Sequence, residues 1–336
     1  MVEPVTPALR ARFAAAIGDP LPRFTAPPRR NPRAILIVGA PRSGSTLLRA
    51  MLAGHPSLFA PPELYLLSHA DLAARRAWYG TAHASQLEGL PRALMGARGV
   101  GADEAVAEIG TLEAAAFGMP QTYGLLQTAI GARILVDKTP FYGVHRHVLA
   151  AAEAIFEDVF FLHLSRHPYG MIRSFEEARL AQLWWPRLAG PDAGPSPFHP
   201  RQLAELVWER IHATVATFLA ERDAGASLHV RYEDLVADPE GTCRAISAAI
   251  GIAFHAGMLD PLGDPAARMT DGLHPDSRMI GDPKFHGHGT IARDAADRWR
   301  DSYDEDFLSP EAWSLADALG HGTKLAKAST RELFDV

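Results

Sequence analysis

The chain has 336 residues, of which 47% are hydrophobic and 21% charged, and its formal net charge is -6 at pH 7. This composition is typical of a globular protein with a proper core, and the negative balance argues against a protein that coats nucleic acid. The single cysteine, Cys243, excludes an intramolecular disulfide framework and is expected to be a buried structural thiol. We find no apolar run of membrane-spanning length and no secretory signal, so we expect a cytoplasmic protein without membrane or nucleic-acid partners.

The N-terminal segment carries several prolines and ends in the basic run PPRRNPR (27–33). We predict that residues 1–33 form a loosely held extension or a linker, with one short helix around residues 8–17. The main domain is predicted to occupy residues 34–336.

From residue 34 onward, short apolar runs alternate with helical stretches. Residues 34–38 (AILIV) are all apolar and lead into Gly39, as expected for a strand buried on both faces. This alternation predicts a single α/β domain, with a central parallel sheet flanked by helices and ligands bound beyond the carboxyl ends of the strands. The other predicted elements are strands at 133–137, 158–164 and 227–232, a helix after the segment 39–46, and helices over about 84–130, 142–155 and 200–222.

The stretch LWWPRLAGPDAGPSPFHP (183–200) is rich in proline, glycine and aromatic residues. We predict that it is irregular, and we interpret it as a lid that selects the acceptor.

The segment GAPRSGST (39–46) joins the first predicted strand to a helix. Its spacing matches the phosphate-binding pattern G-x-x-x-x-G-K-[ST], except that Ser45 replaces the lysine and Arg42 lies inside the loop. Backbone N–H groups and the helix dipole favour an anion at such a turn. A singly charged sulfuryl group has less charge to neutralise than a phosphoryl group, so it needs no further lysine. The groups offered to it are the loop backbone at Gly44 and the side chains of Arg42, Ser43, Ser45 and Thr46.

Two strand ends carry further charged residues. The strand 133–137 ends in Asp137, which could hold magnesium in a P-loop kinase, but Lys138 follows at once and is better interpreted as the cation that polarises the transferred group. After the next strand, Arg166 and Ser174 are placed to grip one phosphate. Two separate anion sites without the Walker lysine indicate 3'-phosphoadenosine 5'-phosphosulfate (PAPS).

The motifs PRSGSTL (41–47), LSRHP (164–168) with Ser174, and RYEDL (231–235) resemble those of the PAPS-dependent sulfotransferase family, over roughly residues 34–305. The resemblance implies direct, in-line sulfuryl transfer to a hydroxyl or amine, with release of adenosine 3',5'-bisphosphate (PAP). It also implies that Tyr232 lies beside the nucleotide. No convincing metal site is visible, so we expect a metal-independent reaction.

The general base is predicted from the same resemblance. Cytosolic small-molecule sulfotransferases take a histidine shortly after their Lys-Thr motif, where this chain has Pro140. In the branch that resembles tyrosylprotein sulfotransferases a glutamate follows the loop helix, and Glu63 has the matching spacing. We therefore predict Glu63 as the base, with Lys138 and Arg42 stabilising the sulfuryl group. The alternatives are a surface carboxylate at Glu63 and a solvated strand-end lysine.

The segments HPSLFAPPEL (55–64) and GDPKFHGHGTI (281–291) are most similar to sulfotransferase domains of bacterial polyketide and olefin synthase pathways. Those domains sulfate a β-hydroxyl on a carrier-bound acyl chain. We expect segment 281–291 to close over the site, with Lys284 binding the nucleotide and His286 as the reserve base, and we expect His55 to act as a structural cap.

Several alternatives stay open from the sequence. A P-loop nucleotide kinase using Asp137 and magnesium is the main competing function, and a non-catalytic nucleotide-binding protein is another. The acceptor hydroxyl could belong to a free small molecule, to a carrier-protein-bound chain or to a peptide. The oligomeric state is not indicated.

Overall fold

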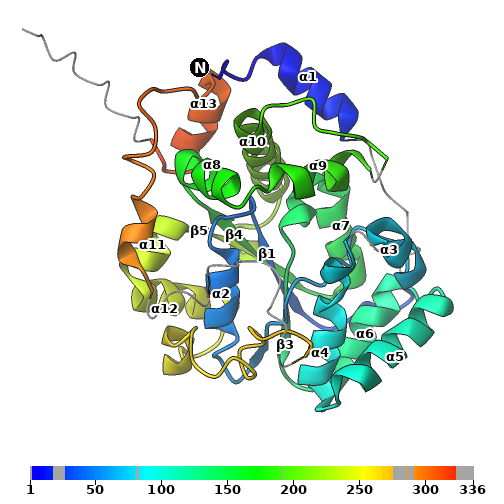
Figure 1. Cartoon of the computed structure of the whole chain (residues 1–336). Coiled ribbons are helices and arrows are strands. Elements are labelled where there is room, and N and C mark those ends of the chain that lie inside the picture. The colour runs from blue at the N-terminus through cyan, green and yellow to red at the C-terminus, as the bar shows by residue number, and fades with distance from the viewer. Residues whose placement is uncertain are drawn as a thin grey trace, which may run out of the picture.

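Five parallel strands form one sheet in the order β2-β3-β1-β4-β5 (Figure 1). The computed structural model describes residues 2–17, 27–80, 83–190, 192–274, 285 and 291–322. The predicted parallel sheet is confirmed, and the short β2 is an addition because two residues carry no periodic signal. The strands are β1 Ala34–Val38, β2 Leu58–Phe59, β3 Ile134–Lys138, β4 Val159–Ser165 and β5 Ser227–Arg231.

Helices cover both faces of the sheet (Figure 1). Alternate residues of the central strand point to opposite faces. Leu36 packs into a cluster with α6, α7 and α10, whereas Ile35 and Ile37 pack into a cluster with α2 and α12. The helices are α1 Pro7–Ala16, α2 Ser45–Leu52, α3 Leu72–Tyr79, α4 Gly89–Arg98, α5 Ala102–Ala114, α6 Met119–Ile130, α7 Arg146–Ile155, α8 Pro168–Glu177, α9 Ala181–Ala189, α10 Pro200–Leu219, α11 Tyr232–Ala237, α12 Pro239–Ile250 and α13 Pro310–Ala318.

The prediction of an irregular segment over 183–200 is wrong for its first part, which belongs to α9. Pro186 lies inside this helix and cannot donate a backbone hydrogen bond there. Aromatic packing compensates for that loss: Trp184 stacks on Phe141 with ring centroids 4.6 Å apart, and Trp185 meets Phe198 edge to face at 5.4 Å. The segment 183–200 that we predicted to be a lid therefore includes part of a packed helix.

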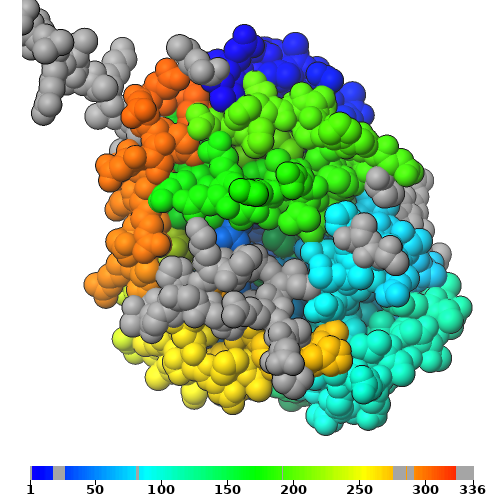
Figure 2. Space-filling view, in the orientation of Figure 1, coloured from blue at the N-terminus to red at the C-terminus, as the bar shows by residue number. Residues whose placement is uncertain are grey.

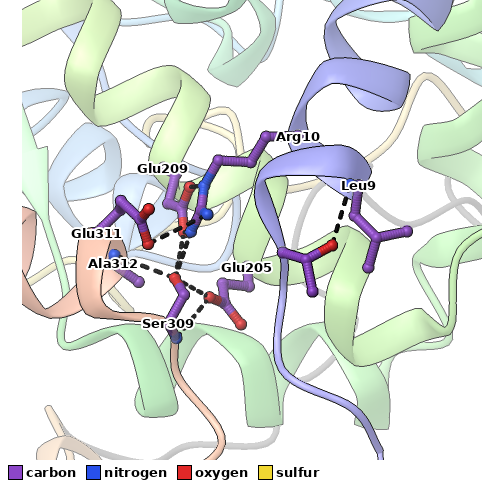
Figure 3. Close-up of polar contacts among 8 residues, drawn as sticks. Leu9, Arg10, Glu205, Glu209, Ser309, Glu311 and Ala312 are labelled. Carbon is purple, nitrogen blue, oxygen red and sulfur yellow. Dashed lines mark hydrogen bonds and ion pairs between the residues drawn. The ribbon is translucent and has the colours of Figure 1, made fainter.

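The predicted short N-terminal helix is confirmed as α1, but it is not loosely held. Phe13 is buried, and Arg10 donates to Glu209 of α10 from Nε at 2.7 Å and pairs with Glu311 of α13 at 3.1 Å (Figure 3). Ser309, the N-cap residue of α13, donates to Glu205 at 2.6 Å in the same cluster. The domain boundary at residue 34 stays a prediction.

Among the described helices, none combines the length and the apolar composition that a membrane crossing requires.

Candidate active site

A cavity of about 810 Å³ lies at the carboxyl edge of the sheet. In Figure 2 the green band of α8 and α9 overhangs this hollow, and blue atoms of the segment around α2 are visible at its floor. The segment after each of the five strands supplies at least one lining residue, as expected for a parallel sheet that binds its ligand at this edge. Nine of the predicted site residues line the cavity: Arg42, Gly44, Ser45, Thr46, Glu63, Lys138, Arg166, Ser174 and Tyr232.

Three predicted site residues are not among the described residues that line the cavity. Ser43 is fully buried and is not among the lining residues, and its Oγ has no hydrogen-bond partner. Lys284 and His286 fall outside the described residues, so their predicted roles stay predictions. His55 does cap locally, because its Nδ1 accepts a hydrogen bond from the Ser57 N–H at 3.0 Å.

The loop between β1 and α2 is shaped by glycine at the point where it enters the helix. Gly44 has φ 89°, and a Cβ atom there would overlap the ring of Tyr232. Among the described residues, the N-cap Gly44 provides no side-chain cap for α2, so the first backbone N–H groups of this helix are candidates for binding an anion. This geometry suits an anion held by the helix N-terminus.

Glu63 and Lys138 form an ion pair in the cavity wall. Glu63 is 6% exposed and Lys138 2% exposed, so neither is the solvated surface group that the alternative interpretations required. The Lys138 ammonium also donates to Thr46 Oγ1 of the loop at 3.5 Å. The opposite charge of each group offsets the cost of burying the other. A carboxylate that can accept a proton thus lies beside a cation and an anion-binding loop.

The two predicted anion sites are physically connected. Arg166 donates to the Arg42 carbonyl at 3.0 Å and to the Ala295 carbonyl at 2.8 Å, and its guanidinium lies 4.5 Å from the Tyr232 ring centroid. Arg42 Nε in turn donates to Ser174 Oγ at 3.0 Å. Arg166 therefore supports the loop backbone, a role that the sequence prediction missed.

Asp137 does not line the cavity. It is fully buried and accepts hydrogen bonds from the hydroxyls of Tyr123 at 2.5 Å and Tyr142 at 3.0 Å. Burial raises the pKa of Asp137 to about 6, against which the tyrosine hydrogen bonds act. The competing kinase interpretation therefore lacks its magnesium ligand at this position, and the described ranges hold no group of three or more His, Cys, Asp or Glu residues that could bind a metal ion.

Three lining residues that sequence reasoning did not select are Tyr65, His83 and Gln86, which share no motif. Trp184 and Arg187 also line the cavity, and both belong to the predicted lid segment 183–200, which was not resolved there into single residues. On α8, Arg173 lines the cavity and pairs with Glu177 at 3.0 Å.

This arrangement can bind an anion next to a potential general base, which is the combination that a group-transfer enzyme needs. A family model described as the sulfotransferase family matches residues 32–256. The chain therefore belongs to the sulfotransferase family.

Similar solved structures support the same assignment and confirm the resemblance stated from the motifs. The sulfotransferase domain from the Synechococcus PCC 7002 olefin synthase is 34% identical with a TM-score of 0.77, over 89% of this chain and 98% of that one. The sulfotransferase domain from the curacin biosynthetic pathway is 35% identical with a TM-score of 0.78, over 87% and 99%.

One curated relative also matches. The nodulation protein NoeE of Sinorhizobium fredii (strain NBRC 101917 / NGR234) is 26% identical over 280 residues, which make up 80% of this chain and 60% of the relative. The chain thus spans about 60% of the length of the curated relative it matches.

Proposed function

We propose that the chain transfers a sulfuryl group from PAPS to an acceptor hydroxyl and releases PAP without a metal ion. The observation that carries this proposal is the buried pair of Glu63 and Lys138, which lies in one cavity with the loop 41–46 and with Arg166 and Ser174. The 5'-phosphosulfate would bind at the N-terminus of α2, and the 3'-phosphate at Arg166 and Ser174.

The reaction forms one bond and breaks one bond at sulfur. The acceptor oxygen attacks the sulfur, its proton passes to Glu63, and the bond from sulfur to the 5'-phosphate oxygen breaks with the electron pair leaving on PAP. The ammonium of Lys138, which is paired with Glu63, would stabilise the charge that develops on the oxygens around sulfur. Arg42 adds a second cation at the loop.

The acceptor class follows from the relatives rather than from the site. The chain is about one third identical to sulfotransferase domains of the olefin synthase and of the curacin pathway. We therefore infer a small-molecule or carrier-protein-bound alcohol, with a polyketide-type β-hydroxyacyl chain as the first candidate. This would place the chain in natural product biosynthesis.

Activity tests this proposal directly. Purified protein is incubated with PAPS and a β-hydroxyacyl chain on a carrier protein, in the presence of EDTA, and both PAP and the sulfated chain are quantified. We expect equal amounts of the two products and no loss of rate with EDTA. Transfer that is abolished by EDTA and restored by magnesium would contradict the metal-independent mechanism.

A further inference from the structure

Arg187 is a buried cation that lines the cavity without a counter-charge. It lies in the last turn of α9 and is 8% exposed. Among the residues that the structure describes, no carboxylate pairs with it, and its Nε has no hydrogen-bond acceptor. A buried charge without a counter-charge lowers the stability of the folded state, so the protein keeps this group at a cost.

The other deeply buried arginines differ from Arg187 in this respect. Arg75 donates to the Leu64 carbonyl at 3.0 Å, Arg92 pairs with Asp271 at 2.7 Å, and Arg49 donates to the Ala60 carbonyl at 2.8 Å. Those three side chains hold loops together. Arg187 differs from these three because it lines the cavity and, among the described residues, its buried Nε has no acceptor.

The protein groups around Arg187 supply no anion either. Burial raises the pKa of Tyr65 to about 12 and raises the pKa of Tyr79 further, so both hydroxyls are neutral at physiological pH. The pKa of His83 is lowered by burial and by the charge of Arg187, so this ring is neutral as well. Gln86 also lines the cavity, is 6% exposed, and has an Oε1 atom without a donor.

Arg187 lies on α9, whereas the proposed nucleotide groups Ser174 and Tyr232 lie on α8 and α11. In Figure 1, α9 and α3 are on one side of α2, and α11 is on the other. The carboxylates in the cavity wall, Glu63 and Glu177, are paired with Lys138 and Arg173. The described residues therefore supply no free counter-charge for Arg187, and we infer that a ligand brings it.

Resting on the proposed function, we propose that Arg187 and Gln86 form an acceptor subsite that binds an anionic group of the acceptor, a carboxylate or a phosphate, while its hydroxyl reaches Glu63. The planar guanidinium matches either oxyanion with two parallel hydrogen bonds. The Gln86 amide adds a hydrogen bond that an apolar wall would lack. The acceptor class is thus a hydroxylated anion rather than a neutral alcohol.

The test is calorimetric titration of the PAP-saturated protein with three probes: 3-hydroxyoctanoate, its methyl ester, and octyl phosphate. We expect at least one of the anions to bind about ten-fold or more tightly than the ester. The Arg187→Gln variant should lose this preference while its affinity for the ester changes less than about two-fold. The probe that binds more tightly shows whether the subsite prefers a carboxylate or a phosphate. No preference for either anion in the unaltered protein overturns the proposal.

Two further measurements separate this subsite from other roles of Arg187. PAP affinity should be unchanged in Arg187→Gln, whereas a loss as large as that for the anionic probe would assign Arg187 to the donor site. The midpoint of thermal unfolding of the free protein should rise by about 2–4 °C, because the variant removes an unpaired buried charge. A clear fall would give Arg187 a structural role and overturn the proposal.

The matched control is Arg244→Gln, which removes the same charge from an exposed pair with Glu240 on α12 and should leave every probe affinity unchanged. The three probes are also titrated without PAP, and these binding measurements need no turnover. A lack of anion preference would therefore disprove the subsite without disproving sulfuryl transfer. Conversely, a failure of PAP binding would remove the proposed donor and leave the anion preference as a separate result.

Discussion

Glu63 follows β2, Lys138 is the last residue of the neighbouring strand β3, and both side chains are almost closed to solvent. If Glu63 is the base, Glu63→Gln keeps the shape of the side chain but cannot take the acceptor proton. We expect kcat to fall by about 10²-fold or more while PAP affinity stays within about two-fold. Single-turnover kinetics and PAP titration measure both, with the exposed Glu240→Gln as control. A variant that retains full turnover would disprove the assignment.

Arg166 supports the loop backbone, and we propose that it also contacts the 3'-phosphate. A single substitution would remove both roles together. Comparing two nucleotides separates them. Arg166→Ala should weaken PAPS by about ten-fold more than it weakens adenosine 5'-phosphosulfate, which lacks the 3'-phosphate, a difference of about 1.4 kcal/mol. Equal losses for the two nucleotides would leave Arg166 with the loop-supporting role alone.

At the scale of elements, α9 carries adjacent tryptophans with different surroundings. Trp184 lines the cavity and stacks on Phe141, whereas Trp185 packs against Phe198 and does not line the cavity. Replacing either by leucine should lower the free energy of unfolding by about 2 kcal/mol. Only Trp184→Leu should also change kcat/KM between acceptors of different chain length. If PAP affinity falls instead and acceptor selection is unchanged, α9 is not part of the acceptor wall.

At the scale of the whole molecule, buried acids make stability depend on pH. Burial raises the pKa of Glu205 to about 7 from an ordinary value of 4.5, so the folded state retains a proton that the unfolded chain releases. The contribution of this group to stability is therefore present below about pH 4.5 and is lost as the pH rises to about 7. Glu205→Gln cannot ionise, so its free energy of unfolding should gain about 1–3 kcal/mol relative to the unaltered protein across this window. Urea unfolding at several pH values measures the difference, and a constant difference would contradict the raised pKa.

The sequence predicted those parts of the fold and site that depend on local signals. A few neighbouring residues are enough to predict the apolar strand β1 and the turn at Gly44. The positions of the charged residues at the strand ends can be predicted because the sheet is parallel. The helix over Pro186 was missed because its stability comes from packing against Phe141 and Phe198, which are distant in sequence from one another. For the same reason no local pattern could show that Arg187 would be buried without a partner.

Packing also decided between the competing functions. The sequence places Asp137 and Lys138 next to each other on one strand, so position in the sequence alone does not decide which side chain reaches the ligand. In the fold their side chains lie on opposite sides, with Asp137 between the hydroxyls of Tyr123 and Tyr142 and Lys138 in the cavity wall. This alternation is the direct result of the two-residue period of a strand.

The nucleotide is the central claim, and metal-free calorimetry that compares PAP with ATP tests it most directly. The account predicts tight binding of PAP and little binding of ATP, because the residues proposed for both anion sites line one cavity and Ser45 replaces the Walker lysine. The same titration is repeated with magnesium. Preferential binding of ATP, especially when magnesium is added, would contradict the account and return the kinase interpretation.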